Sequence, residues 1–230
     1  MKILSIDASS QILSIALLID GVLLEKQYPS GKNHSDNIIS KIRTMISNAD
    51  LSFKDINAIA FGAGPGSFTG LRIAAGVAYG MAYANNLPIV GINNLEALAK
   101  QSGYKNTIAC IDARMGQIYL GAYKKNDDKY VPLIEGGLFD PSNLPAIDVD
   151  EAIIIGSGVR PYKNILMDKY KTTGIDIDEN EHSLAGSIAL LAIDRFGSRF
   201  NLDQAGLIYL RNKVAQTIAE RFEQKKSELK

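Results

Sequence analysis

The feature that most constrains the fold of this chain is an internal repetition of one strand pattern. The segment SIDASSQILSIALLIDGVLLEKQYP, residues 5–29, lies over CIDARMGQIYLGAYKKNDDKYVPLI, residues 110–134, with Ile-Asp-Ala in register. Further along, AIAFGAGP at 58–65 is echoed by AIIIGSGV at 152–159. Short apolar strings also match by chance, but two matches in the same order favour a duplication. The sequence therefore predicts two copies of one structural unit.

Each copy is expected to begin with a strand, a turn and a β-hairpin. Turn residues such as Asp20-Gly21 separate the strands, and apolar residues at helical spacing mark the helices. In the first copy the expected elements are strands at 3–6, 12–19, 22–27, 58–61 and 88–92 and helices at about 38–46 and 71–84. This order describes a βββαβα unit.

A duplicated βββαβα unit implies two α/β lobes with a cleft between them, which is the architecture of the actin-like ATPase (ASKHA) fold. Open α/β sheets bind ligands at the carboxyl ends of their strands. Four segments of this chain fall at such ends: Asp7, Asp112, Gly62–Gly66 and Gly156–Gly158. The cleft between the lobes is therefore the first place to look for a ligand site.

The boundary between the lobes is expected near 101–106, where the helix signals end. The N-terminal lobe then covers residues 1–103 and the C-terminal lobe residues 104–230. Two helices, at 184–200 and from 203 to about 220, are expected to close the C-terminal lobe. The tail after them alternates acids and bases, which is typical of a solvated helix end.

Composition excludes several classes of function. The 230 residues carry 25 basic and 25 acidic side chains, so no overall positive field draws the chain to nucleic acid or membrane, and a role on RNA would need a partner. The single cysteine, Cys110, excludes an internal disulfide. The N-terminus does not resemble a signal peptide and no apolar run reaches membrane-spanning length. We therefore expect a cytoplasmic protein without a membrane partner.

The stretch FGAGPGSFTGLRIAAGVAYG, residues 61–80, resembles a phosphate-binding loop that leads into a helix. Its glycines stand at positions 62, 64, 66, 70, 76 and 80, and none is followed five residues later by the Gly-Lys of a Walker loop. The dinucleotide pattern G-x-G-x-x-G fails as well, because Ser67 and Thr69 stand where its third glycine would be. The spacing therefore fits neither standard phosphate motif.

Several strings together resemble one family, the bacterial TsaB (YeaZ) proteins. They are ILSIDASS, GAGPGSFTGLRIA, PIVGINNLEALA, the late IGSG and YLRNKVA, and they are spread over nearly the whole chain. The resemblance implies the actin-like fold and a role in making threonylcarbamoyladenosine at position 37 of tRNA, beside the anticodon. It also implies a non-catalytic subunit that supports the paralogous catalytic TsaD together with the ATPase TsaE, and that touches tRNA only indirectly.

Comparison with the catalytic paralogues predicts that a metal site is absent. Those relatives carry two metal-binding histidines in the pattern N-H-L-E-G-H, whereas this chain reads NNLEAL, with Asn94 and Leu98 in their places. A leucine cannot bind a metal, and an amide is a poor substitute for imidazole. The two histidines present are His34 and His182, and neither lies in a ligand-spaced cluster. His34 is interpreted as a helix-cap or surface residue, although a role at an interface stays open.

The cleft residues support only a weak nucleotide site. Acidic residues in the positions of Asp7 and Asp112 bind magnesium-nucleotide in active relatives, but the turn ASSQ lacks their phosphate-wrapping glycine and threonine. We expect no cofactor of its own, and weak ATP or ADP binding within a complex. The candidate nucleotide-proximal residues are Asp7, Gly64, Gly66, Ser67, Thr69, Asp112, Gly156 and Gly158.

Two other functional classes stay as alternatives. An actin-fold enzyme, either a small-molecule kinase or a nucleotide hydrolase, is supported by the paired aspartates and the Gly-x-Gly strand ends. A peptidase is disfavoured, because the metal-binding histidines are missing and no serine or cysteine dyad can be assembled. Cys110 in its apolar strand is expected to be a core residue. No catalytic residue is therefore assigned.

The helix after the glycine-rich loop is predicted to carry a docking surface. Ile73, Val77 and Met81 form an apolar stripe expected to face the sheet. Beside it runs a stripe of Arg72, Gly76, Gly80 and Ala84. Glycine inside a helix costs about 0.5 to 1 kcal/mol relative to alanine, so close approach of another backbone is the expected reason.

That backbone is either the chain's own first helix or a second chain. The family resemblance favours a second chain, either another copy or TsaD, which would then compete for one face. The candidate interface residues are His34, Arg72, Gly76, Gly80 and Ala84. Arg211, in the family string YLRNKVA, is expected to position the last helix against the first lobe.

Overall fold

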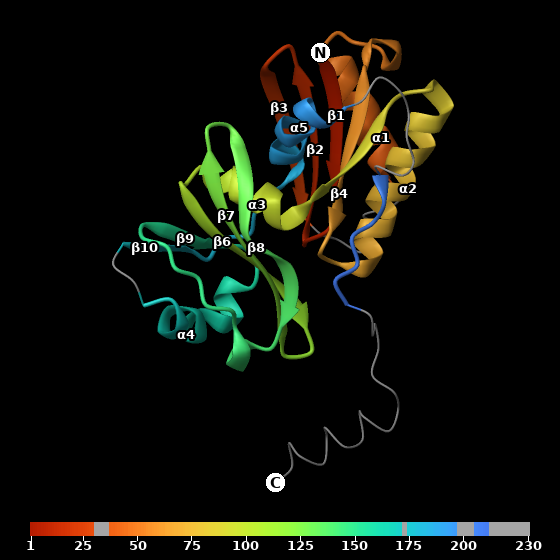
Figure 1. Cartoon of the computed structure of the whole chain (residues 1–230). Coiled ribbons are helices and arrows are strands. Elements are labelled where there is room, and N and C mark those ends of the chain that lie inside the picture. The colour runs from red at the N-terminus through yellow and green to blue at the C-terminus, as the bar shows by residue number, and fades with distance from the viewer. Residues whose placement is uncertain (30–36, 172–173, 197–204, 212–230) are drawn as a thin grey trace, which may run out of the picture.

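The computed structural model describes residues 1–29, 37–171, 174–196 and 205–211, and Figure 1 shows two lobes, each built around its own sheet. The first sheet has five strands in the order β3-β2-β1-β4-β5, and the second has five in the order β10-β9-β6-β7-β8. The strands of the first sheet are β1 Lys2–Asp7, β2 Ile12–Ile19, β3 Val22–Pro29, β4 Ala58–Gly64 and β5 Ile89–Asn93. The strands of the second are β6 Asn106–Arg114, β7 Gln117–Asn126, β8 Lys129–Phe139, β9 Ala152–Ile155 and β10 Ile175–Asp178.

The two sheets have the same topology, so the predicted duplication is confirmed. In the first, β1 is antiparallel to β2 and parallel to β4. In the second, β6 is antiparallel to β7 and parallel to β9. When the second sheet is read from β8, its order β8-β7-β6-β9-β10 matches β3-β2-β1-β4-β5 strand for strand. This is the actin-like α/β fold in two lobes, as the sequence predicted.

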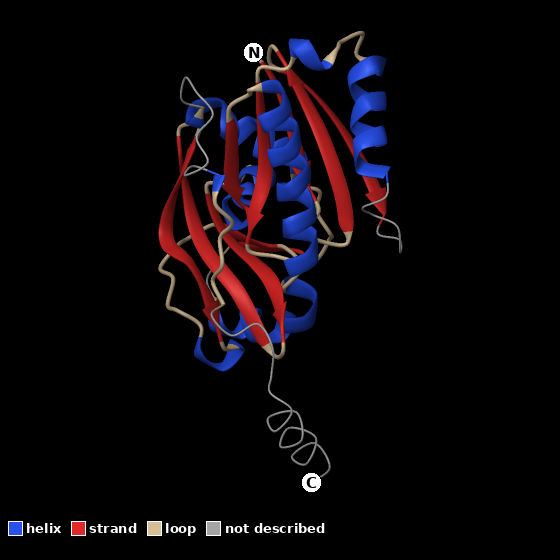
Figure 2. Cartoon of the chain, turned by 90° about the vertical axis from the view of Figure 1, so that its right-hand side faces the viewer, coloured by secondary structure: helices blue, strands red, loops and turns tan. Residues whose placement is uncertain are grey.

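The helices form layers on the faces of these sheets. They are α1 Ile38–Asn48, α2 Phe68–Asn85, α3 Asn94–Ser102, α4 Val159–Lys169 and α5 Ala185–Ala192, with short 3-10 turns η2 Phe53–Asp55, η3 Pro141–Asn143 and η4 Ile193–Arg195. In Figure 2, α2 stands against the strands of the first sheet. No described helix is both long and apolar enough to cross a bilayer.

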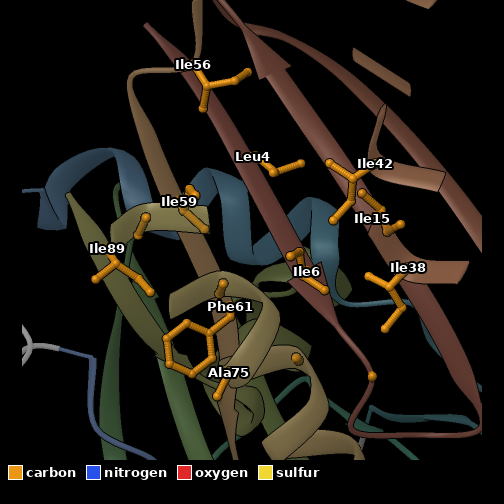
Figure 3. Close-up of a cluster of buried hydrophobic side chains, with 14 of the residues drawn as sticks. Leu4, Ile6, Ile15, Ile38, Ile42, Ile56, Ile59, Phe61, Ala75 and Ile89 are labelled. Carbon is orange, nitrogen blue, oxygen red and sulfur yellow. The ribbon is translucent and has the colours of Figure 1, made fainter. Parts of the chain in front are cut away.

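Three clusters of buried side chains form the core of the protein. The first lies between the N-terminal sheet, α1 and α2, and Figure 3 shows Leu4, Ile59 and Phe61 among its members. The second lies around α3 and α5 and includes side chains of both sheets. The third lies between the C-terminal sheet and α4. The second cluster thus packs the two lobes against each other on the side of α3 and α5.

The end of the chain differs from the expected pair of closing helices. In its described part, up to residue 196, the first is present as α5 and η4. Helix α5 packs against β1, β2 and β4 of the N-terminal sheet, although its residues belong to the stretch assigned to the C-terminal lobe. Residues 205–211, expected to be helical, have no helix after a single 3-10 residue. The rest of the second predicted helix lies outside the described residues. Packing of α5 on the first sheet is a tertiary contact that helical periodicity does not encode.

The buried face of α2 also differs from the prediction. Its buried residues include the small side chains Ala74, Ala78 and Ala82, whereas Ile73, Val77 and Met81 are only partly buried at the edge of the contact. The helix therefore lies close to the sheet on alanines, and the larger apolar residues fill the flanks. The stripe predicted from four-residue spacing, Ile73, Val77 and Met81, is therefore one position away from the buried stripe.

Candidate functional site

A cleft of about 870 Å³ opens between the lobes at the carboxyl ends of β1, β4 and β6. One wall is formed by residues 9–11, 65–69 and 71 of the N-terminal lobe, and the other by residues 111–115 at the end of β6 with Ser157 and Arg160. Of the predicted nucleotide-proximal residues, Gly66, Ser67, Thr69 and Asp112 line this cleft. The other four are not among its lining residues.

The glycines of the first loop are explained by packing within the lobe. A Cβ at Gly70 would lie 1.8 Å from the Ala8 carbonyl oxygen, and a Cβ at Gly66 would lie 2.7 Å from the Ser9 Cβ. The backbone N–H of Ser67 donates to the Ser9 carbonyl at 2.8 Å. The turn after β1 is therefore pressed against the loop that follows β4. These glycines are required for that close contact, whether or not an anion binds nearby.

The glycines of the other strand ends also lie against the chain itself. Gly64 has a positive φ of 113° and faces the Ile208 carbonyl oxygen, 2.8 Å from where its Cβ would be. Gly156 has a φ of 118°, and a Cβ built on it would lie 2.2 Å from the Cys110 carbonyl oxygen. Gly158 packs on Cys110 and Ile118. Each position needs glycine because another part of the backbone occupies the space of a side chain.

Asp7 is buried beneath the glycine-rich loop and does not reach the cleft. Its Oδ1 accepts a hydrogen bond from the Ser9 backbone N–H at 3.2 Å, while its Oδ2 and the Asn94 Oδ1 have no hydrogen-bond partner among the described residues. Burial raises the pKa of Asp7 to about 6, and the nearby charge of Glu25 adds to the rise. Gly62 leaves room for both side chains, since its Cβ would lie 2.3 Å from Asp7 Oδ1 and 2.8 Å from Asn94 Oδ1.

Asp112, at the corresponding place in the second lobe, lies at the cleft wall. It forms an ion pair with Arg114 at 3.0 Å, and its Oδ1 also accepts from the Arg114 backbone N–H at 2.8 Å. Its own backbone N–H donates to Ser157 Oγ. The two aspartates that correspond in the repeated sequence are therefore in opposite environments. Asp7 is buried with no ion pair to a described residue, and Asp112 forms an ion pair beside the cleft.

The two positions that replace metal-binding histidines take part in packing. Asn94 is buried at the start of α3 and donates from Nδ2 to the Pro65 carbonyl at 3.1 Å. Leu98 is buried in the cluster between the lobes. Among the described residues, no three His, Cys, Asp or Glu side chains gather as they would around a metal ion. Cys110 is fully buried, and burial raises the pKa of its thiol.

The outer face of α2, defined here as Arg72, Gly76, Gly80 and Ala84 with Tyr83, is exposed along the helix. A Cβ at Gly76 or Gly80 would meet no atom of the described residues outside α2 within 4 Å. The chain's own α1 therefore does not supply the close backbone that these glycines predict. Tyr83, which the sequence reasoning did not select, is 82% exposed on the same helix. His34 lies outside the described residues.

One end of the outer face of α2 is fixed by aromatic residues that the sequence reasoning missed. The Arg72 guanidinium lies 3.3 Å from the ring centre of Phe68 and 5.3 Å from that of Tyr209. Both rings are nearly half exposed. Phe68 could have been found from its i, i+4 spacing to Arg72 on the helix. The contact with Tyr209 joins distant parts of the chain and has no local signal.

Arg211 is hydrogen-bonded to the C-terminal lobe, and the last helix that its sequence string is expected to position lies outside the described residues. Its guanidinium donates to Gln117 Oε1 at 2.8 Å, to the Arg114 carbonyl at 3.3 Å and to Met115 Sδ at 3.0 Å, all at the turn between β6 and β7. It therefore contacts the C-terminal lobe and not the first lobe. The contacts to the first lobe come from the residues that precede it.

Comparison with known proteins identifies the family. Residues 26–165 match the family model for TsaD, described as tRNA N6-adenosine threonylcarbamoyltransferase. The chain is 30% identical over 235 aligned positions to the Escherichia coli tRNA threonylcarbamoyladenosine biosynthesis protein TsaB, covering 94% of this chain and 96% of that protein. The Bacillus subtilis protein of the same name is 35% identical over 127 residues, which cover 54% of this chain and 56% of the relative.

The structural comparison agrees with the sequence comparison. A crystal structure titled as YeaZ from Pseudomonas aeruginosa superimposes with a TM-score of 0.77 at 28% identity, over 91% of this chain and 99% of that one. A second Pseudomonas aeruginosa structure, titled as an uncharacterized protein with similarity to peptidase YeaZ, gives a TM-score of 0.78 with the same identity and coverage. The chain therefore belongs to the TsaB (YeaZ) family of tRNA threonylcarbamoyladenosine biosynthesis proteins.

Proposed function

We propose that this protein is a non-catalytic scaffold subunit in the formation of threonylcarbamoyladenosine at position 37 of tRNA. In this role it binds and activates a TsaD-like catalytic paralogue, together with a TsaE-like ATPase. It acts in the cytoplasm, forms a homodimer when alone and contacts tRNA only through the complex. Membership of the family supports the pathway, and the form of α2 supports the scaffold role.

The observation that carries the scaffold role is the outer face of α2. Two glycines and an alanine interrupt the exposed side of an eighteen-residue helix, and nothing in the described chain lies within 4 Å of a Cβ at either glycine. Each glycine costs about 0.5 to 1 kcal/mol of helix stability relative to alanine. A partner helix that approaches the backbone closely would offset this cost. An exposed tyrosine beside the glycines suits an interface, because tyrosine is enriched there.

The packing of the cleft loops favours weak nucleotide binding by the isolated chain. The turn of residues 8–9 packs directly on the loop of residues 66–70, so the two backbones that could enclose a phosphate contact each other. We propose that the isolated chain binds ATP or ADP weakly and that a partner is needed to complete any nucleotide site. No metal or cofactor is proposed for the protein alone.

The role in tRNA modification is tested by depleting the protein and measuring tRNA nucleosides by mass spectrometry. The proposal predicts that threonylcarbamoyladenosine falls on depletion and is restored by the wild-type chain. A variant with Gly76→Leu should restore it poorly. Asn164→Leu, which places a leucine at an exposed position on α4 of the other lobe, serves as the control and should restore it fully. A normal level of the nucleoside after depletion would refute the role.

An actin-fold kinase or nucleotide hydrolase is the second candidate. The observation that favours it is the size of the cleft and the presence of Asp112, Arg114 and Arg160 in its wall. Isothermal titration of the isolated chain with magnesium-ATP separates the two candidates. Micromolar binding with turnover would favour the enzyme, whereas weak binding without turnover is expected of the scaffold.

A further inference from the structure

Residues 205–211, called here the strap, run from the N-terminal lobe along the cleft to the C-terminal lobe. The strap begins at Ala205, whose carbonyl accepts a hydrogen bond from Tyr79 Oη of α2. It then lies along the end of β4, where the Ile208 backbone N–H donates to the Ala63 carbonyl at 2.8 Å. It ends at Arg211 on the turn between β6 and β7. One short segment thus contacts both walls of the cleft.

The contacts of the strap with the N-terminal lobe are tightly packed. The Ile208 carbonyl oxygen lies 2.8 Å from where a Cβ at Gly64 would be. The Gly206 carbonyl oxygen lies 3.3 Å from where a Cβ at Gly91 would be. Leu207 and Ile208 pack against the N-terminal core cluster. Glycine at positions 64 and 91 therefore leaves space for the strap. The fold is built to hold this segment at the carboxyl ends of β4 and β5.

The strap contacts the C-terminal lobe through two side chains: Leu210 Cδ1 lies 3.7 Å from where a Cβ at Gly136 of β8 would be, and Arg211 makes the hydrogen bonds to the lobe. Arg211 donates to three atoms of the β6–β7 turn, a region in which Arg114, Met115 and Gly116 all have positive φ. Residues 208–211 and 111–115 both line the cleft, so this contact spans it. Loss of the Arg211 hydrogen bonds would free the turn from the strap while leaving the N-terminal contacts intact.

The strap also reaches the outer face of α2. Tyr209 lies against Arg72, which in turn lies on Phe68, and the ring centres of Phe68 and Tyr209 are 6.5 Å apart. Tyr209 is 49% exposed and Phe68 is 45% exposed, so a partner seated on the Arg72 end of this face would cover part of both rings. A partner on α2 therefore contacts the middle of the strap, two residues before Arg211.

We propose that the strap couples the outer face of α2 to the opening of the interlobe cleft, so that a partner on α2 binds the strapped, closed arrangement of the lobes more tightly than the released one. The second half of this inference rests on the proposed docking function of α2. Two ligand sites whose occupancies bias one equilibrium are coupled reciprocally. Release of Arg211 should therefore open the cleft and weaken docking at a face that Arg211 does not form.

The opening of the cleft is measured by the distance between spin labels on Cys residues placed at Lys54 and Lys169. Cys110 is buried, so it should not take up label. The wild-type chain is expected to give one narrow distance distribution. Arg211→Ala and Gln117→Ala, which remove the two sides of the same hydrogen bond, should each broaden it. Arg160→Ala removes another arginine of the cleft wall and should leave it unchanged.

Association at α2 is measured on the same variants by sedimentation of the homodimer and by titration with the TsaD-like paralogue. Arg211→Ala, Gln117→Ala and Tyr209→Ala should weaken association at least fivefold, the lower range of known coupling factors. Arg160→Ala should change it less than twofold. Circular dichroism establishes that each variant is folded.

The outcomes separate the strap from the docking function. An unchanged label distance in both Arg211→Ala and Gln117→Ala would overturn control of the cleft by the strap. A changed distance with unchanged association, while Gly76→Leu does weaken association, would overturn the coupling alone. If Gly76→Leu has no effect on association either, the docking function of α2 fails, and with it the coupling, whereas the distance measurement still decides whether the strap controls the cleft.

Discussion

The two lobes share one topology but treat their equivalent strand ends in opposite ways. In the N-terminal lobe Asp7, at the end of β1, is shut off from the cleft, because the turn after it packs on the loop after β4 and its side chain is buried with no ion pair to a described residue. In the C-terminal lobe the end of β6 stays at the cleft, and Asp112 pairs with Arg114. Two copies of a fold can thus share one sheet topology while the strand-end aspartate lies beside the cleft in one copy and is buried in the other. Substitutions at the two ends test this contrast.

The largest effect is expected where the N-terminal loops touch. Gly70→Ala places a Cβ 1.8 Å from the Ala8 carbonyl oxygen, so the backbone must move. Overpacking of this kind is expected to cost about 3 kcal/mol of unfolding free energy or more. Urea unfolding followed by circular dichroism measures the cost. Stability within about 0.5 kcal/mol of the wild type would show that the two loops are not packed as described.

The second effect concerns the buried aspartate. Asp7 has a pKa of about 6 in the folded chain against 3.8 unfolded. Its ionisation is therefore harder in the folded state, so the folded state binds more protons between these values and stability falls as pH rises from about 4 to about 6. Above pH 6 the full cost applies, about 3 kcal/mol at 1.36 kcal/mol per pKa unit.

Asp7→Asn removes this cost, because the amide carries no charge at any of these pH values. The variant is expected to be more stable than the wild type by up to about 3 kcal/mol at pH 8, and the gain should vanish below pH 4. Asp55→Asn is a control of opposite sign, because hydrogen bonds from Ser52 lower the pKa of Asp55. That variant should be less stable than the wild type at neutral pH and equal to it in acid. A pH-independent effect of Asp7→Asn would contradict the burial of the charge.

The third effect is the equivalent change in the other lobe. Asp112→Asn removes an ion pair whose arginine is 75% exposed, and such pairs contribute about 0 to 1 kcal/mol. The variant is expected to lose no more than this at any pH, since the amide oxygen can still accept from the Arg114 backbone. Comparison of the Asp7 and Asp112 variants at pH 8 measures the contrast between the lobes directly. A stabilisation at Asp112 equal to that at Asp7 would remove the contrast.

The smallest effect contrasts glycines of one helix. Gly76→Ala and Gly80→Ala should each stabilise the monomer by about 0.5 to 1 kcal/mol, because no described residue outside α2 lies near the added methyl group and alanine favours the helix. Thermal unfolding at low protein concentration measures the gain. Destabilisation would mean that these positions are packed within the monomer. Gly70→Ala on the same helix is the opposing case.

Much of the fold could be predicted because it is local or repeated. Strand alternation, the Asp20-Gly21 turn and the Ile-Asp-Ala match led to the correct topology. The inward face of α2 was assigned wrongly, because periodicity locates a stripe but not whether small or large residues face the sheet. The place of α5 on the first sheet depends on packing between distant segments. Sequence proximity could not supply it.

The candidate site was only partly predictable. The glycine stripe of α2 was found from sequence, since glycines in a helix carry a cost that needs a reason. The burial of Asp7 and the contact of Tyr209 with Arg72 were missed, because both depend on which loops lie across a strand end. The use of Gly66 and Gly70 for loop packing was missed for the same reason. A glycine in the sequence can indicate that another group packs closely there, but it does not identify that group.

We propose that the outer face of α2 is the docking surface. The affinity of the folded Gly76→Leu chain for a second copy and for the TsaD-like paralogue tests this proposal. Among the described residues, no atom outside α2 lies within 4 Å of a Cβ at this position, so the monomer should fold normally. We expect Gly76→Leu to weaken both associations at least tenfold, while Asn164→Leu on α4 leaves both unchanged. Equal affinities for the wild type and a folded Gly76→Leu chain would contradict the proposal.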